Sequence, residues 1–180
     1  MDVNVMEEIE RIERIIGRLS NTQKILLSTD GSVTRILDVL RGTVTIRTIK
    51  QEFIPSTPEI ADKLRISPGE MVNHRVVVIG NNEPLIHAVS YIPLSRLDDG
   101  FREDLIRADI PIGRILKKHS IESRREIEIL DIESPSSELR EIFKTDSPML
   151  TRTYNIIHQD EVLIRIKETF PFDWFREEFR

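Results

Sequence analysis

The pattern of hydrophobic and polar positions predicts helices at the start of the chain. In residues 6–19 the apolar positions recur three or four residues apart, with Glu and Arg between them: Met6, Ile9, Ile12, Ile16 and Leu19. This spacing is typical of one face of an amphipathic helix. Two more short helices are expected, around residues 23–27 and 36–40, separated by the polar turn at residues 28–32.

From residue 43 onward Val, Ile and Thr become frequent, which favours strands. Six strands are expected, at residues 43–54, 71–79, 85–92, 121–132, 149–158 and 161–170. The alternation slips between Ile46 and Ile49, which indicates a bulge. Gly80–Glu83 and Gln159–Asp160 are turn sequences and join two pairs of strands as hairpins.

Short helices are expected between the strands, at residues 57–64, 101–108, 111–118 and 136–143. Because two connections are hairpins and strands do not alternate regularly with helices, the fold class is α+β: an antiparallel sheet with helices on one face or at its edges. We expect one domain over residues 1–180, with residues 1–20 as an amphipathic helix packed on it.

Composition excludes several kinds of site and partner. The chain has no cysteine, so disulfides, zinc–cysteine sites, iron–sulfur clusters and thiol nucleophiles are ruled out. The four histidines lack metal-ligand spacing, and no metal site is expected. A net charge of −5 argues against a nucleic-acid partner. With no long apolar run and no signal peptide, we expect a cytoplasmic protein without a membrane partner. Formation of a homodimer stays an open possibility.

Glu168 lies where the last strand should carry an apolar residue. Side chains alternate with period two, which places Glu168 in register with Val162, Ile164, Ile166 and Phe170. A carboxylate on a buried face needs hydrogen bonds or a cation. With a turn at Gln159–Asp160, its neighbours across the hairpin are expected to be the small polar residues Thr151, Thr153 and Asn155, forming a polar pocket wall.

Arg75 shows the same pattern in its strand, where it is in phase with Val77 and Ile79. With a turn at Asn81–Asn82, Ala88 is expected opposite Arg75, leaving space beside the guanidinium. The planar fork of arginine matches a carboxylate at two points, so this arrangement predicts an anion pocket. The alternative is a structural Arg75–Glu168 ion pair, or an exposed sheet face, and periodicity alone leaves both interpretations open.

Three other features allow a structural as well as a functional interpretation. Pro111 opens a helix whose free amides at Ile112 and Gly113 could receive an anion, although Asp109 could simply cap it. Arg124–Arg125, with the nearby lysines 117 and 118, is interpreted as a solvated basic face. The aromatic-rich tail, residues 170–179, is expected to be a core plug or a dimer contact.

Five short motifs occur in order: Ser28–Thr34 (STDGSVT), Arg75 followed by Asn82-Glu83-Pro84, Ile92–Ser95 (IPLS), Pro111–Arg114 (PIGR) and Lys167-Glu168. Together they resemble the chorismate lyase (chorismate–pyruvate lyase) family, in its archaeal and mycobacterial-type branch, over about residues 26–170. The resemblance implies a six-stranded antiparallel sheet with helix–turn–helix flaps over a buried ligand. It also implies an enzyme that splits chorismate into 4-hydroxybenzoate and pyruvate without a metal or organic cofactor.

The resemblance further implies a role for each of four residues. Arg75 matches the carboxylate-binding arginine, and Glu168 matches the acid that contacts the ring hydroxyl. Val33 and Ile112 match the positions whose backbone amides hold carboxylates. The alternative is a non-catalytic domain that binds a small aromatic acid, like the effector domains of transcription regulators that share this fold. The first forty residues lack a winged hairpin and a basic recognition helix, which counts against a regulator. A third option is a homologue that acts on another small carboxylate.

Overall fold

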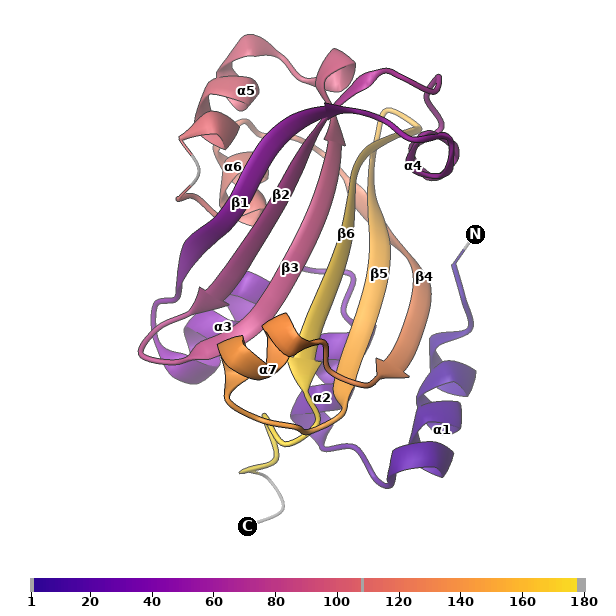
Figure 1. Ribbon diagram of the computed structural model, residues 1–180, viewed down its shortest axis with the longest axis vertical. Coiled ribbons are helices and arrows are strands. Elements are labelled where there is room, and N and C mark those ends of the chain that lie inside the picture. The colour runs from indigo at the N-terminus through magenta and orange to yellow at the C-terminus, as the bar shows by residue number, and fades with distance from the viewer. Residues whose placement is uncertain (1, 108, 178–180) are drawn as a thin grey trace.

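The sheet of this protein is antiparallel and has six strands in the order β1-β2-β3-β6-β5-β4 (Figure 1). The structure, a computed structural model, describes residues 2–107 and 109–177. The strands are β1 (Thr45–Pro55), β2 (Met71–Gly80), β3 (Pro84–Pro93), β4 (Arg124–Glu133), β5 (Met149–His158) and β6 (Glu161–Pro171). The predicted α+β class and all six predicted strands are therefore confirmed.

The described part of the chain contains seven α-helices and one short 3-10 helix, η1 (Leu94–Arg96). The α-helices are α1 (Val5–Ile16), α2 (Asn21–Ser28), α3 (Val33–Arg41), α4 (Pro58–Leu64), α5 (Asp99–Ile106), α6 (Ile112–Lys118) and α7 (Ser137–Phe143). The first ends earlier than predicted because Gly17 adopts a φ of 98°. The helix predicted at residues 101–108 starts and ends two residues sooner, and Ala108 lies outside the described residues. None of the described helices combines the length and apolarity needed to cross a membrane.

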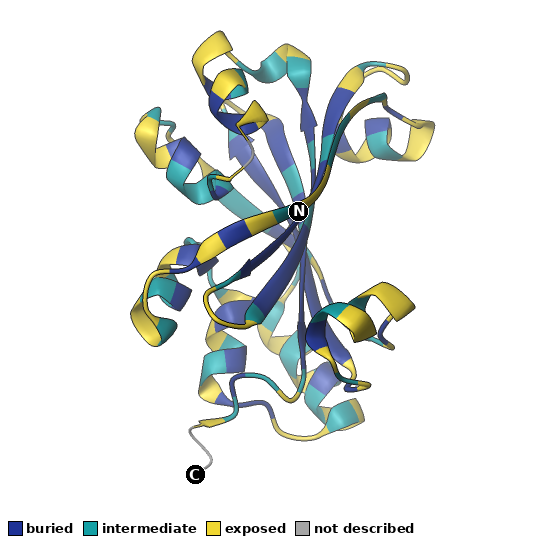
Figure 2. Cartoon of the chain, turned by 60° about the vertical axis from the view of Figure 1, so that its left-hand side comes forward, coloured by how far each residue is buried: buried dark blue, intermediate teal, exposed yellow. Residues whose placement is uncertain are grey.

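Helices cover both faces of the sheet, and the strands between them are largely buried (Figures 1 and 2). On one face α4 packs over a small cluster that contains Leu64, Val72, Ile157 and Val162. The opposite face, which we call the pocket face, carries the main core and lies beneath α2, α3, α5 and α6. Helix α1 lies against β4, where Arg11 Nη2 donates a hydrogen bond to the Leu130 carbonyl at 2.8 Å.

Strand register is set by bulges, of which the sequence pattern identified one. The shift between Thr48 and Lys50 in β1 confirms the predicted bulge. In the β5–β6 hairpin Gln159 and Asp160 have positive φ, as expected for its two-residue turn, but the register then shifts between Ile156 and Ile157. A shift of one residue moves side chains to the opposite face.

That second bulge overturns the predicted surroundings of Glu168. Val162 lies on the opposite face from Glu168, and the residue across from Glu168 is Arg152. The predicted wall of Thr151, Thr153 and Asn155 is therefore wrong.

In the β2–β3 hairpin Arg75 pairs with Ser90, and Ala88 pairs with Val77. The turn contains three residues and a bulge follows it, so the register differs by two from the prediction. An even shift keeps Ala88 and Ser90 on the face of Arg75, which preserves the small side chains beside it.

The described part of the C-terminal tail packs into the core, which agrees with the first of its two expected roles, a core plug. Phe170 and Phe175 are buried in an edge-to-face contact. Gln23, fully buried in α2, donates hydrogen bonds from Nε2 to the carbonyls of Phe172 and Trp174 at 2.6 and 2.8 Å. The tail thereby fixes α2 on the sheet. Phe179 lies outside the described residues.

We predict that Gln23→Ala lowers the free energy of unfolding by about 1–3 kcal/mol, because two buried carbonyls lose their donor. Urea unfolding followed by circular dichroism measures the change. Asn21→Ala, an exposed amide in the same helix, should change stability by less than about 0.5 kcal/mol. Equal midpoints for the Gln23 and Asn21 variants would contradict the tethering role.

Candidate functional site

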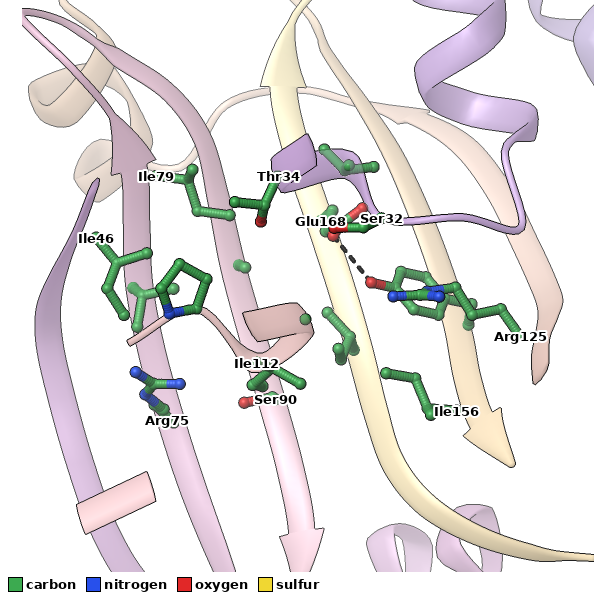
Figure 3. Close-up of a pocket in the computed structure, with 17 residues that line it drawn as sticks. Ser32, Thr34, Ile46, Arg75, Ile79, Ser90, Ile112, Arg125, Ile156 and Glu168 are labelled. Carbon is green, nitrogen blue, oxygen red and sulfur yellow. Dashed lines mark hydrogen bonds between the residues drawn. The ribbon is translucent and has the colours of Figure 1, made fainter. Parts of the chain in front are cut away.

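A cavity lies between the pocket face of the sheet and the first residues of α3 and α6. Its apolar floor is formed by Ile46, Val77, Ile79, Ala88, Ile156 and Ile166, and its roof by Ser32, Val33, Thr34, Pro111, Ile112 and Gly113. The polar groups along the floor are Arg75, Ser90, Arg125, Tyr154 and Glu168 (Figure 3). All four residues assigned by resemblance, Val33, Arg75, Ile112 and Glu168, therefore line one cavity.

Two helical hairpins close the roof: the first flap, α2 with α3, and the second flap, α5 with α6. They meet at Gly113, where a Cβ atom would lie 3.0 Å from Ser32 Oγ. Arg114 Nη2 also donates to both carboxylate oxygens of Asp38, each at 3.1 Å. The cavity has a volume of about 50 Å³, enough for a few water molecules at roughly 10–15 Å³ each.

Arg75 supplies a cation on the β2 side of the cavity. It is 1% exposed, and its Nη2 donates to the carbonyl of Ile110, just before α6, at 3.0 Å. Burial lowers the pKa of Arg75 to about 10, while the nearby Asp109 acts in the opposite direction. The guanidinium thus remains charged at neutral pH and is suited to binding an anion.

Glu168 is only 6% exposed, yet both of its carboxylate oxygens have partners. Tyr154 donates its hydroxyl to Oε1 at 2.9 Å, and Arg152 donates Nε to Oε2 at 2.6 Å. The structural ion pair considered for Glu168 is thus formed with Arg152 rather than with Arg75. Glu168 itself lines the cavity, so it remains available to a ligand.

Arg152 was not predicted as part of the site, because the bulge that turns it toward Glu168 leaves no mark on the alternation of β5. It is fully buried, and its Nη1 donates to the Thr29 carbonyl in the first flap at 2.7 Å. Burial acts to lower the pKa of Arg152, but the adjacent Glu168 carboxylate and Tyr154 together outweigh it, and the pKa is raised. Burial, reinforced by Glu168, raises the pKa of Tyr154, so its hydroxyl stays protonated as a donor.

Val33 and Ile112 are the first residues of α3 and α6. At these positions a backbone N–H has no partner within the helix, and the helix dipole favours an anion. No side chain caps α6, whose N-cap is Pro111. The expectation that Asp109 caps this helix is therefore wrong, and the amide of Ile112 lies at the cavity roof.

The interpretation of Arg124–Arg125 as a solvated face holds for only one of the two residues. Arg124 is exposed and pairs with Glu126 and Asp160. Arg125 lines the cavity, and its Nη1 donates to the Asp30 carbonyl in the first flap at 3.3 Å. Alternation along β4 could have separated them, since adjacent residues face opposite sides of a sheet.

Fold and cavity together define a class of protein in which helical flaps cover a pocket on an antiparallel sheet. The effector domain of PhnF from Mycobacterium smegmatis has this fold: it superposes with a TM-score of 0.70 at 17% identity, over 80% of this chain and 90% of that domain. A longer PhnF structure gives a TM-score of 0.68 at 16% identity, and this chain covers 65% of it. Identity this low supports the fold alone.

The sequence comparison is more specific. Residues 27–177 match the family described as chorismate pyruvate-lyase Rv2949c-like, and the chain belongs to that family. MJ0807 of Methanocaldococcus jannaschii, whose name assigns it provisionally as a lyase, is 37% identical over 92% of this chain and 86% of its own length. The chorismate pyruvate-lyase of Mycobacterium leprae is 24% identical over 67% of this chain and 55% of its own length.

We predict that Arg152→Met lowers the free energy of unfolding by about 3–5 kcal/mol, because Glu168 would remain buried without its cation. Urea unfolding measures this loss. The matched control is Lys167→Met, at the position of β6 next to Glu168. It removes a partly exposed ion pair with Glu133 of β4 and should cost about 0–1 kcal/mol. If both variants lost equally little, the buried pair would not be a stabilising feature of the fold.

Proposed function

We propose that this protein is a lyase that converts chorismate to 4-hydroxybenzoate and pyruvate. The observation that carries the proposal is the cavity itself, which holds the cationic Arg75 and the carboxylate of Glu168 on either side of an apolar floor. A six-membered ring with a carboxylate at one end and a hydroxyl at the other matches that arrangement. Membership of the chorismate pyruvate-lyase Rv2949c-like family supports this choice of ligand.

In the proposed complex the ring carboxylate lies at Arg75, whose fork can bind both of its oxygens. The backbone amides of Val33 and Ile112 add donors from the roof, and exclusion of water by the flaps strengthens each of these interactions. The ring occupies the apolar floor. The site thereby fixes the orientation of the substrate before any bond breaks.

The reaction is a redox-neutral elimination, so it consumes no oxidant or reductant. The C3–O bond to the enolpyruvyl group breaks, and its electron pair leaves with the oxygen. The C4–H bond also breaks, and its electrons form the double bond that completes the aromatic ring. The proton ends on the methylene carbon of the departing enolpyruvate, which becomes pyruvate. Aromatisation provides the driving force, and the protein has to hold the side chain in the eliminating geometry.

Glu168 is proposed to accept a hydrogen bond from the C4 hydroxyl. Each of its oxygens has one protein partner, and a carboxylate has about four lone-pair sites, so further acceptor capacity remains. A carboxylate in this position orients C4 and stabilises positive charge that develops as the C3–O bond breaks. Arg152 and Tyr154 are positioning residues, because they hold the Glu168 carboxylate in place through hydrogen bonds to its two oxygens.

We predict that the purified protein forms 4-hydroxybenzoate and pyruvate in equal amounts from chorismate, faster than the spontaneous decay. Chromatography of both products measures the rate. Arg75→Ala should lower kcat/KM by about 100-fold, because a charge-assisted hydrogen bond is worth about 1.5–3 kcal/mol. Unequal product yields, or full activity in Arg75→Ala, would contradict this assignment.

We predict separately that Glu168→Gln lowers kcat by about 10- to 100-fold with a smaller effect on KM, because the interaction strengthens as charge develops. Glutamine keeps the shape of the side chain, and circular dichroism checks that the fold is retained. Because the buried Arg152 loses its counter-charge, a lower free energy of unfolding is expected alongside. Lys167→Gln, at the neighbouring position on the other face of β6, serves as the control. A near-normal kcat in Glu168→Gln would remove this residue from the mechanism.

The second candidate function is a non-catalytic domain that binds a small aromatic acid. The resemblance in fold to the PhnF effector domain favours it. The same assay separates the two functions, because absence of turnover together with calorimetric binding of 4-hydroxybenzoate would identify a sensor.

A further inference from the structure

We propose that Arg125 is a second carboxylate-binding residue of the pocket and that it makes the site selective for ligands with two carboxylates. The inference deepens the proposed function and rests on it for the identity of the natural ligand. Arg125 lies on β4 and pairs with Ile156, so its side chain shares the pocket face with Tyr154 and lines the cavity.

Arg125 and Arg75 lie on the same face of the sheet and approach the cavity from strands toward its opposite edges. Their strands, β4 and β2, are separated by β3, β6 and β5, which is four strand spacings or roughly 19 Å between backbones. Figure 3 shows Glu168 between the two arginines, closer to Arg125. The space between the two guanidinium groups therefore contains the apolar floor and the proposed contact with the ring hydroxyl.

The hydrogen bonds of Arg125 leave capacity for a ligand. Its Nη1 makes a long hydrogen bond to the Asp30 carbonyl, and its guanidinium carbon lies 5.9 Å from the centre of the Tyr154 ring. Its Nε is buried and has no hydrogen-bond partner within the described ranges. Nor does any described carboxylate form a salt bridge with it, whereas the adjacent Arg124 has two such partners. A cationic donor left in this state is stabilised by an incoming anion.

The charges around the cavity match a dianion. Arg75 and Arg125 line it together with one carboxylate, Glu168, whose charge is compensated by Arg152. The cavity is thus positive in a chain whose net charge is −5. A monocarboxylate bound at Arg75 would leave Arg125 without a carboxylate partner.

The positions of the two arginines also fit the proposed substrate. In chorismate the hydroxyl is on C4, opposite the ring carboxylate, and the enolpyruvyl ether with the second carboxylate is on the adjacent C3. With the ring carboxylate at Arg75 and the hydroxyl at Glu168, the ring can be turned about the line between them so that the ether carboxylate on C3 reaches toward Arg125. Arg125 would then distinguish the substrate from 4-hydroxybenzoate, which has lost that carboxylate.

Calorimetric titration with two stable ligands tests the inference independently of turnover: 3-(carboxymethoxy)benzoate and 3-methoxybenzoate, which differ by one carboxylate. The native protein should bind the dicarboxylate about 10- to 100-fold more tightly. Arg125→Gln should abolish that preference and bind 3-methoxybenzoate within about threefold of the native protein. Arg125→Lys, which keeps the charge, should retain part of the preference, and Arg124→Gln should retain all of it.

Two results would overturn the inference: no preference for the dicarboxylate in the native protein, or a preference that persists in Arg125→Gln. Assays with chorismate separate this failure from failure of the proposed function. Turnover with an unchanged KM in Arg125→Gln would support the lyase function and exclude Arg125 as a substrate-binding residue. A dicarboxylate preference that depends on Arg125, without turnover, would identify a dicarboxylate-binding protein and remove the lyase.

Discussion

The carboxylate of Glu168 lies beneath the helical flaps on a largely apolar sheet face, and the rest of the site depends on how that charge is stabilised. Desolvating a carboxylate is costly unless hydrogen bonds and a cation replace water. Arg152 and Tyr154 provide both, from the adjacent strand. Arg152 also donates to the Thr29 carbonyl, so the group that stabilises the charge is the same group that anchors the first flap.

Two contacts join the flaps to each other. The N-terminal ends of α3 and α6 meet at Ser32 and Gly113, and Arg114 of α6 pairs with Asp38 of α3. Between the flaps and the sheet lies the cavity, about 50 Å³ in volume. The contacts that hold the flaps over it limit its contact with water, which strengthens charged interactions inside.

The likeness to transcription-regulator effector domains shows why the function must be argued from the site. A sheet with flaps over a pocket can bind a small acid as a signal or as a substrate, and the fold is compatible with both. The distinguishing features are the groups around the ligand. Here a carboxylate is held in a fixed position beside an apolar floor with cations on either side, which is an arrangement that can orient a reacting ring as well as bind it.

Local patterns in the sequence were enough to predict the secondary structure, the α+β class and the burial of two charged residues. Alternation placed Arg75 and Glu168 on buried faces, because strand periodicity depends only on neighbouring positions along the chain. Motifs then brought Val33 and Ile112 into the same site by resemblance. The hairpin turn at Gln159–Asp160 and the slip in β1 were also readable from local sequence.

Pairing across strands was decided only by the tertiary structure. The bulge between Ile156 and Ile157 leaves no gap in the hydrophobic pattern, since residues on both sides of it are buried. Yet this one-residue shift in register makes Arg152 and Tyr154 the partners of Glu168, in place of the predicted wall of Thr151, Thr153 and Asn155. The separate environments of Arg124 and Arg125 follow from alternation along β4, but the position of Arg125 in the cavity depends on the flap that covers this strand. Sequence determined the elements and the burial of Arg75 and Glu168. Long-range packing determined which buried residues meet, because a one-residue shift in register exchanges the two faces of a sheet.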